Sequence, residues 1–88
     1  DLEQRLLDLA TTLARVEPFD ELTTEAALRT LAAEMGNGAG KYIHPLRVAL
    51  TGKSASPPIF DVAVALGKER TLRRLRRLID SIPKLTSP

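Results

Sequence analysis

Prolines and glycines divide this chain of 88 residues into short segments, and apolar residues recur at helical spacing inside them. The first segment carries such residues alternately four and three positions apart, at Leu2, Leu6, Leu9, Leu13 and Val16. This spacing places them on one face of a helix, which Pro18 then ends because proline disfavours a helical conformation in the preceding residue. No segment shows the sustained alternation of apolar and polar residues that is typical of a strand. The pattern predicts an all-α fold.

A second helix is predicted to begin at Thr23 or Thr24, since threonine is a common N-cap and Glu25 would favour the positive end of the helix dipole. Its buried face is expected to contain Leu28, Leu31 and Met35. The glycine-rich stretch 36–41 lacks the preceding strand and the glycine spacing of a phosphate-binding loop. It is therefore interpreted as a helix end and a connector.

A third helix is predicted from Lys41 or His44 to Leu50. Pro45 suits its first turn, where the missing N–H costs nothing, and Gly52 suits the position that closes a short helix. A fourth helix is predicted over residues 57–66, with Ser56 as its N-cap and Gly67 at its end.

A fifth helix follows at once, with a core stripe formed by Leu72, Leu75, Ile79 and Ile82. Arginines are expected around the rest of its circumference, at Arg70, Arg73, Arg74, Arg76 and Arg77. Pro83 is predicted to end this helix, and the last few residues are expected to fray.

Length and composition favour one small domain over residues 1–88, because a core of this size seldom divides. The chain has three aromatic residues, so the core must be built mostly from aliphatic side chains, as in helical bundles. We therefore expect a compact bundle of about five short helices that folds alone as a monomer. The absence of cysteine excludes disulfides and thiolate metal sites, and no apolar run approaches the length of a membrane span.

Charge is distributed unevenly between the two halves of the chain. Residues 1–39, the acidic half, hold eight acidic and three basic residues and contain the first two predicted helices. Residues 40–88, the basic half, hold three acidic and ten basic residues. A segregated positive surface favours a polyanionic partner such as RNA.

The basic half also contains a group of hydrogen-bond donors near a proline-stiffened turn. Arg47 lies on the short third helix, and Lys53, Ser54 and Ser56 lie on the loop that follows. The planar fork of an arginine beside hydroxyl groups is suited to hydrogen-bonding unstacked bases. Residue type alone leaves open whether Arg47 reads a base, caps a helix end or pairs with an acid.

The segment HPLRVALTGKSASPPIFDVAVALGKERTLRRLRRL, from His44 to Leu78, is similar to the C-terminal anticodon-binding domain of bacterial-type glutamyl-tRNA synthetases. These class I aminoacyl-tRNA synthetases carry a similar P-L-R-x-A-L-T-G, then S/T-P-x-L/I-F, then L-G-K-E-R-x-L-x-R-L. The resemblance is dense from Tyr42 to Leu78. It implies the α-helical anticodon-binding fold of this class.

The resemblance further implies that the arginine of P-L-R and the S/T-P-x-L turn contact the first two anticodon letters. By position these residues are Arg47, Ser56, Pro57 and Ile59. Pro58 stands where relatives often have glycine, and Ile59 where many have leucine. The turn is therefore expected to be stiffer, with a reshaped apolar contact.

Contacts with RNA phosphates are expected from the basic residues Lys53, Arg70, Arg73, Arg74 and Arg77. The arginines of the fifth helix cannot all face one ligand, because successive residues turn by about 100° around the axis. Some of them are expected to pair with the acidic half.

The sequence offers no catalytic or metal-binding constellation. His44 has no acidic residue within five positions, so a structural role near the start of the third helix is expected. The serines and threonines near it have no histidine at helical spacing that would support nucleophilic catalysis. We therefore expect no enzyme activity, metal or cofactor in these 88 residues.

The resemblance implies a cytoplasmic glutamate–tRNA ligase, or an organellar one in a eukaryote, whose separate catalytic domain uses ATP and Mg²⁺. The partner would be tRNA-Glu, or both tRNA-Glu and tRNA-Gln, and the neighbouring domain would read the third anticodon letter. The alternative is a protein-interaction or regulatory module of the same ancestry. Binding to tRNA that depends on the anticodon distinguishes the two hypotheses.

Overall fold

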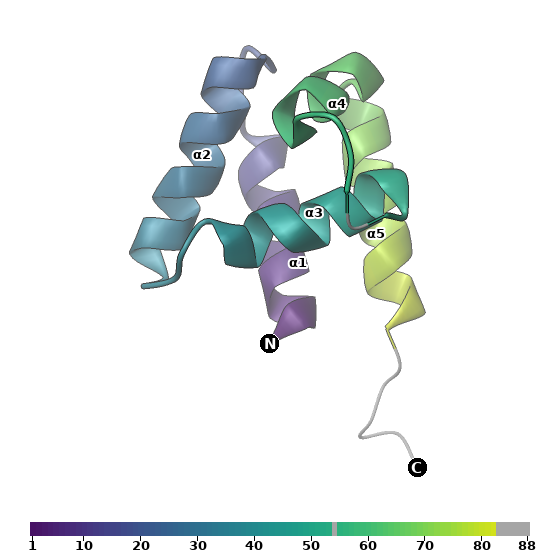
Figure 1. The fold of residues 1–88 in the computed structure, drawn as a ribbon. Helices are drawn as coiled ribbons and strands as arrows, with labels where there is room; N and C mark the ends of the chain where they lie inside the picture. Colours follow the sequence, from purple (N-terminus) through teal and green to yellow (C-terminus); the bar gives the residue numbers. More distant parts are fainter. Residues whose placement is uncertain (54, 83–88) are drawn as a thin grey trace.

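The computed structural model describes residues 1–53 and 55–82, and within them the chain forms helices and no strand. The helices are α1 (Leu2–Ala14), α2 (Glu21–Glu34), α3 (Gly40–Thr51), α4 (Ile59–Leu66) and α5 (Lys68–Ser81). The prediction of an all-α bundle of about five short helices is confirmed (Figure 1). None of the helices in the described ranges is long and apolar enough to cross a membrane. The predictions for Ser54, Pro83 and the last residues lie outside the described part of the chain.

Helix α1 contributes its leucine stripe to the core and packs against α2, α3 and α5. The side chain of Asp1 caps its first turn by accepting a hydrogen bond from the backbone N–H of Gln4 at 2.7 Å. The predicted stripe is buried except at Leu2, which is 41% exposed. The prediction for Leu2 is wrong because this residue lies on the first turn, where it lines an open groove beside Pro45 and Leu78.

Helix α2 begins earlier than predicted, at Glu21, because Asp20 and not a threonine is its N-cap. The carboxylate of Asp20 accepts a hydrogen bond from the N–H of Thr23 at 2.9 Å, and the Thr23 hydroxyl lies 3.1 Å from the N–H of Asp20. Leu28 and Leu31 are buried as predicted, but Met35 is 50% exposed. Met35 lies after the last turn, where Gly36 takes a left-handed φ of 70° and leads the chain away.

Helix α3 also begins earlier than predicted, at Gly40, so Pro45 lies inside the helix and not in its first turn. Backbone hydrogen bonds such as Ile43 N–H to Ala39 C=O form a complete turn ahead of the proline. Pro45 is buried against the bundle. The C-terminal end is as predicted: Gly52 has φ 72°, and its N–H donates to the carbonyl of Val48 at 2.8 Å.

Helix α4 begins at Ile59, two residues later than predicted, and Ser56 is not its N-cap. Pro58 occupies that position with ψ 127°, and its missing N–H removes one donor from the helix start. A proline disfavours the helical conformation in the residue before it, which excludes Pro57 from the helix. Gly67, with φ 88°, then separates α4 from α5 as predicted.

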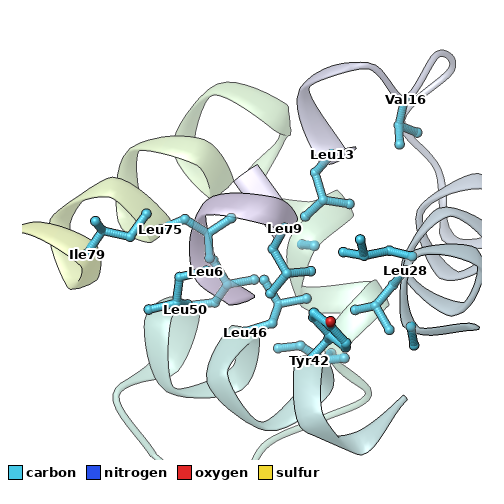
Figure 2. Packing of buried hydrophobic residues seen from close by; sticks show 14 residues of the cluster. Leu6, Leu9, Leu13, Val16, Leu28, Tyr42, Leu46, Leu50, Leu75 and Ile79 are labelled. Atoms are coloured by element: carbon cyan, nitrogen blue, oxygen red, sulfur yellow. The ribbon is translucent and has the colours of Figure 1, made fainter. Parts of the chain in front are cut away.

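The core lies where α1, α3 and α5 meet, with α2 and α4 completing it (Figure 2). Leu75 is fully buried and Ile79 nearly so, whereas Leu72 and Ile82 are partly buried against the core. Thr71 is buried on the same face, which was not predicted, and its hydroxyl donates to the carbonyl of Ala63 at 3.2 Å. The fifth-helix stripe is therefore confirmed at Leu75 and Ile79, whereas Ile82 lies just beyond the helix, which ends at Ser81.

Candidate nucleic-acid interface

Arg47 on α3 and Ser56 on the connection to α4 are joined by a hydrogen bond, although they are nine positions apart. The Nε of Arg47 donates to the Oγ of Ser56 at 3.0 Å, and this hydroxyl donates to the carbonyl of Pro57 at 2.8 Å. Both side chains are half-buried. Within the described residues, the two Nη groups of Arg47 have no hydrogen-bond partner. The arrangement holds the plane of the guanidinium and leaves its terminal donors available.

Thr51 holds the start of this connection, and the sequence analysis missed that role. Its hydroxyl donates to the carbonyl of Arg47 at 2.8 Å and accepts a hydrogen bond from the N–H of Lys53 at 3.1 Å. A threonine in the last turn of a helix, directly before a glycine, is the signal that could have indicated it. Lys53 itself is exposed.

The structure separates the two apolar members of the predicted site. Pro57 is exposed beside Ser56 and offers a rigid ring on the surface of the turn. Ile59 is 3% exposed and belongs to the hydrophobic core. The Ile59 side chain therefore anchors the turn to the core and offers no surface to a base in this conformation, because the first turn of α4 directs it inward.

The predicted phosphate-binding arginines Arg70, Arg73, Arg74 and Arg77 are all exposed and together line a shallow hollow of about 220 Å³. An Nη of Arg74 donates to the carbonyl of Leu50 in the last turn of α3, at 2.6 Å. Arg73 forms an ion pair with Glu69 on its own helix, at 3.2 Å. Arg76 does not line this hollow.

A lysine connects the basic half to the acidic half. The Nζ of Lys68 lies 3.1 Å from a carboxylate oxygen of Glu17 and 3.3 Å from the carbonyl of Ala14. The same ammonium lies 6.0 Å from the centre of the Phe19 ring. Within the described residues, the ion pair between the halves is therefore formed by Lys68 at the start of α5, and not by the arginines for which such pairing was expected.

His44 is exposed on the second turn of α3 and lines the open groove with Leu2 and Leu78. Among residues 1–53 and 55–82, no three histidine or acidic side chains lie together in a way that could hold a metal ion.

The profile of the anticodon binding domain family matches residues 1–79, which include the Arg47–Ser56 pair and most of α5. The chain belongs to this family. The five helices are therefore those of an anticodon-binding domain.

Similar proteins are glutamate–tRNA ligases. Glutamate–tRNA ligase 2 of Thermoanaerobacter pseudethanolicus is 45% identical over 74 residues, which are 84% of this chain and 15% of that protein. The enzyme of Nitrobacter hamburgensis is 51% identical over 67 residues, which are 76% of this chain and 14% of that protein. The crystal structure of a glutamate tRNA ligase from Elizabethkingia meningosepticum, in complex with its amino acid, superposes with a TM-score of 0.87. The two sequences are 26% identical, and the match covers 92% of this chain and 16% of the ligase chain.

These comparisons confirm the resemblance on which the sequence analysis relied and give no support to the protein-interaction alternative. This chain corresponds to about one sixth of the length of the ligases that it matches.

Proposed function

We propose that this domain reads the anticodon of tRNA-Glu as one part of a longer glutamate–tRNA ligase. Family membership and the similarity to glutamate–tRNA ligases support the class of partner. The observation that carries the proposal is the hydrogen bond between Arg47 and Ser56. It joins two residues to which the resemblance assigns contacts with the anticodon, and it orients a guanidinium that has unused donors.

The geometry defines how Arg47 would address a base. Its Nε is already used by Ser56, so the two terminal Nη groups are the pair that remains for a bidentate contact. Such an end-on contact requires two acceptors side by side on the edge of an unstacked base. The exposed ring of Pro57 offers a wall beside that base, and Ile59 holds the turn in place from the core.

Under this proposal, these 88 residues bind the tRNA and the remainder of the ligase carries out the chemistry. ATP and Mg²⁺ would serve that other part, and no step of anticodon reading depends on them. We place the protein in the cytoplasm, with tRNA-Glu as its partner. Whether tRNA-Gln is a second substrate depends on the reading of the third anticodon letter, which the proposal assigns to a neighbouring domain.

The decisive experiment is the substitution Arg47→Lys, which keeps the charge and removes the planar pair of donors. We expect a loss of about 1–3 kcal/mol in preference for the cognate anticodon, as for other bidentate base contacts. Titrations of wild type and variant against tRNA-Glu, and against the same tRNA altered in the first two anticodon letters, measure this preference at one salt concentration.

The matched control is Arg76→Lys, the same change at an exposed arginine of α5. It should leave the preference unchanged. An equal loss of affinity for both RNAs in Arg47→Lys would mean that Arg47 holds a phosphate or supports the fold. That result would contradict the proposed base-reading role.

A further inference from the structure

Four arginines lie along one exposed face of α5. They are spaced three, one and three positions apart, at Arg70, Arg73, Arg74 and Arg77. At 3.6 residues per turn this spacing places them in a single stripe about two turns long. This arginine stripe lies on the side of the helix opposite Leu75. Its four members line one hollow of about 220 Å³.

The arginine stripe has fewer counter-charges than cations in the described part of the chain. Glu69 pairs with Arg73, and this pair is exposed and therefore weak. Arg70 and Arg77 have no hydrogen-bond or ion-pair partner among residues 1–53 and 55–82, even though Asp80 is one turn beyond Arg77. Like charges at these spacings repel each other, so an anionic ligand on this face would relieve the repulsion.

Arg74 has a different position from its neighbours, because its guanidinium is anchored on α3. It donates to the carbonyl of Leu50 in the last turn of α3, which is the negative end of the α3 dipole. A groove lined by Val48, Gly52, Arg74 and Arg77 runs between the two helices at this point. The arginine stripe therefore lies beside the last turn of α3, in which Leu50 follows Arg47 by three residues.

We propose that Arg70, Arg73 and Arg77 bind backbone phosphates of the tRNA whose anticodon Arg47 reads, while Arg74 positions α3 relative to the arginine stripe. This inference rests on the proposed function, since it assumes the same RNA. An extended row of exposed guanidiniums suits a chain of phosphates because each guanidinium can take two phosphate oxygens. The flanking Glu69 would give up Arg73 to a phosphate, as an exposed ion pair readily does.

The test is the double variant Arg70→Gln, Arg77→Gln, titrated with tRNA-Glu and with the anticodon-altered tRNA over a range of salt concentrations. Affinity should fall for both RNAs by the same factor, and the preference set by Arg47 should stay. The slope of log K against log salt should become shallower by about 0.7–0.9 for each phosphate contact that is lost. Both residues are exposed, so the thermal unfolding midpoint should match that of wild type.

The control is Arg76→Gln, which removes one charge from α5 at about 100° from Arg77. It should leave the slope unchanged. An unchanged slope in the double variant would overturn the proposal. An equal effect of Arg76→Gln would also overturn it, because binding would then follow net charge and not the arginine stripe. A normal slope change with no anticodon preference in wild type would contradict anticodon reading alone, so the two proposals fail separately.

Discussion

The acidic and basic halves use their polar side chains in different ways. In the acidic half, Asp1 and Asp20 cap the helices that they precede, so their hydrogen bonds remain within one element. In the basic half, none of the three helices has a side-chain bond at its N-cap. Two of its arginines instead join separate elements, since Arg47 bonds to Ser56 and Arg74 bonds to the carbonyl of Leu50.

This difference indicates that the acidic half serves as a scaffold and that the basic half carries the candidate site. Local caps stabilise α1 and α2 wherever they are placed, whereas bonds between elements fix the position of one element relative to another. The basic half therefore lacks the side-chain bonds that stabilise helix N-termini, and its bonds between elements define the turn beside Arg47.

The two halves share one hydrophobic core, so a core substitution in one half should destabilise both. Leu75 on α5 is fully buried, and α5 packs against α1 of the acidic half. Leu75→Ala should lower the free energy of unfolding by about 2–5 kcal/mol, and both halves should unfold in one transition. Denaturant titration followed by circular dichroism measures this. Leu22→Ala, at a position 82% exposed, is the control and should change stability by less than about 0.5 kcal/mol.

Ser56 should matter for recognition of the anticodon and contribute little to the stability of the fold. Ser56→Ala removes the acceptor that holds the Nε of Arg47, so the preference for the cognate anticodon should fall by about 1 kcal/mol. Ser56→Thr keeps the hydroxyl and should restore most of it. Ser81→Ala, which removes an exposed hydroxyl bonded within α5, should have no effect on the preference. If Ser56→Ala binds both the cognate and the altered tRNA as wild type does, Ser56 does not orient Arg47.

Arg74 should matter for stability more than the other arginines of α5. Arg74→Gln removes the donor to the Leu50 carbonyl, and we expect a loss of about 1 kcal/mol in unfolding free energy. For a domain of this size, that loss lowers the melting temperature by about 4–8 °C. Arg76→Gln provides the comparison and should melt as wild type does. Equal melting temperatures for the two variants would show that the bond between α3 and α5 contributes nothing.

Asp20 should make the stability of the domain sensitive to acid. The N–H and the hydroxyl of Thr23 bind the carboxylate and lower its pKa below the ordinary value of 3.8. A lowered pKa in the folded state means that Asp20 stabilises the protein above the unfolded pKa and loses this effect as the pH falls through the folded one. Asp20→Asn keeps the capping oxygen but not the charge, so its melting temperature should fall less than that of wild type between pH 6 and pH 2. Parallel acid dependence in both proteins would contradict this role.

The sequence predicted the helices better than their ends. Leucine spacing identifies the buried face of α1, because burial repeats with the helical period. The start of α2 was missed because Asp20 and Thr23 are both good capping residues, and their mutual hydrogen bonds decide which one caps the helix. The start of α4 was missed because two consecutive prolines move the helix beyond Ser56.

The site followed from the resemblance more than from the pattern of residues. The spacing of nine residues between Arg47 and Ser56 has no helical or strand period, so their contact depends on how the turn folds. The burial of Ile59 likewise depends on the direction in which α4 begins, which an apolar residue type does not specify. Thr51 was missed because its hydrogen bonds are with backbone atoms, and only its place in the last helical turn, directly before Gly52, could have indicated them.

The packing of α1 against α5 determines when this domain can be completed during synthesis. The two helices come from opposite ends of the 88 residues (Figure 1). A ribosome releases the chain from its N-terminus, so Leu6 and Leu9 emerge well before Leu75, the α5 residue at the centre of the shared core. Until α5 has emerged, the apolar face of α1 is in contact with water, a chaperone or the helices that follow it. The core is therefore completed only when α5 leaves the ribosome.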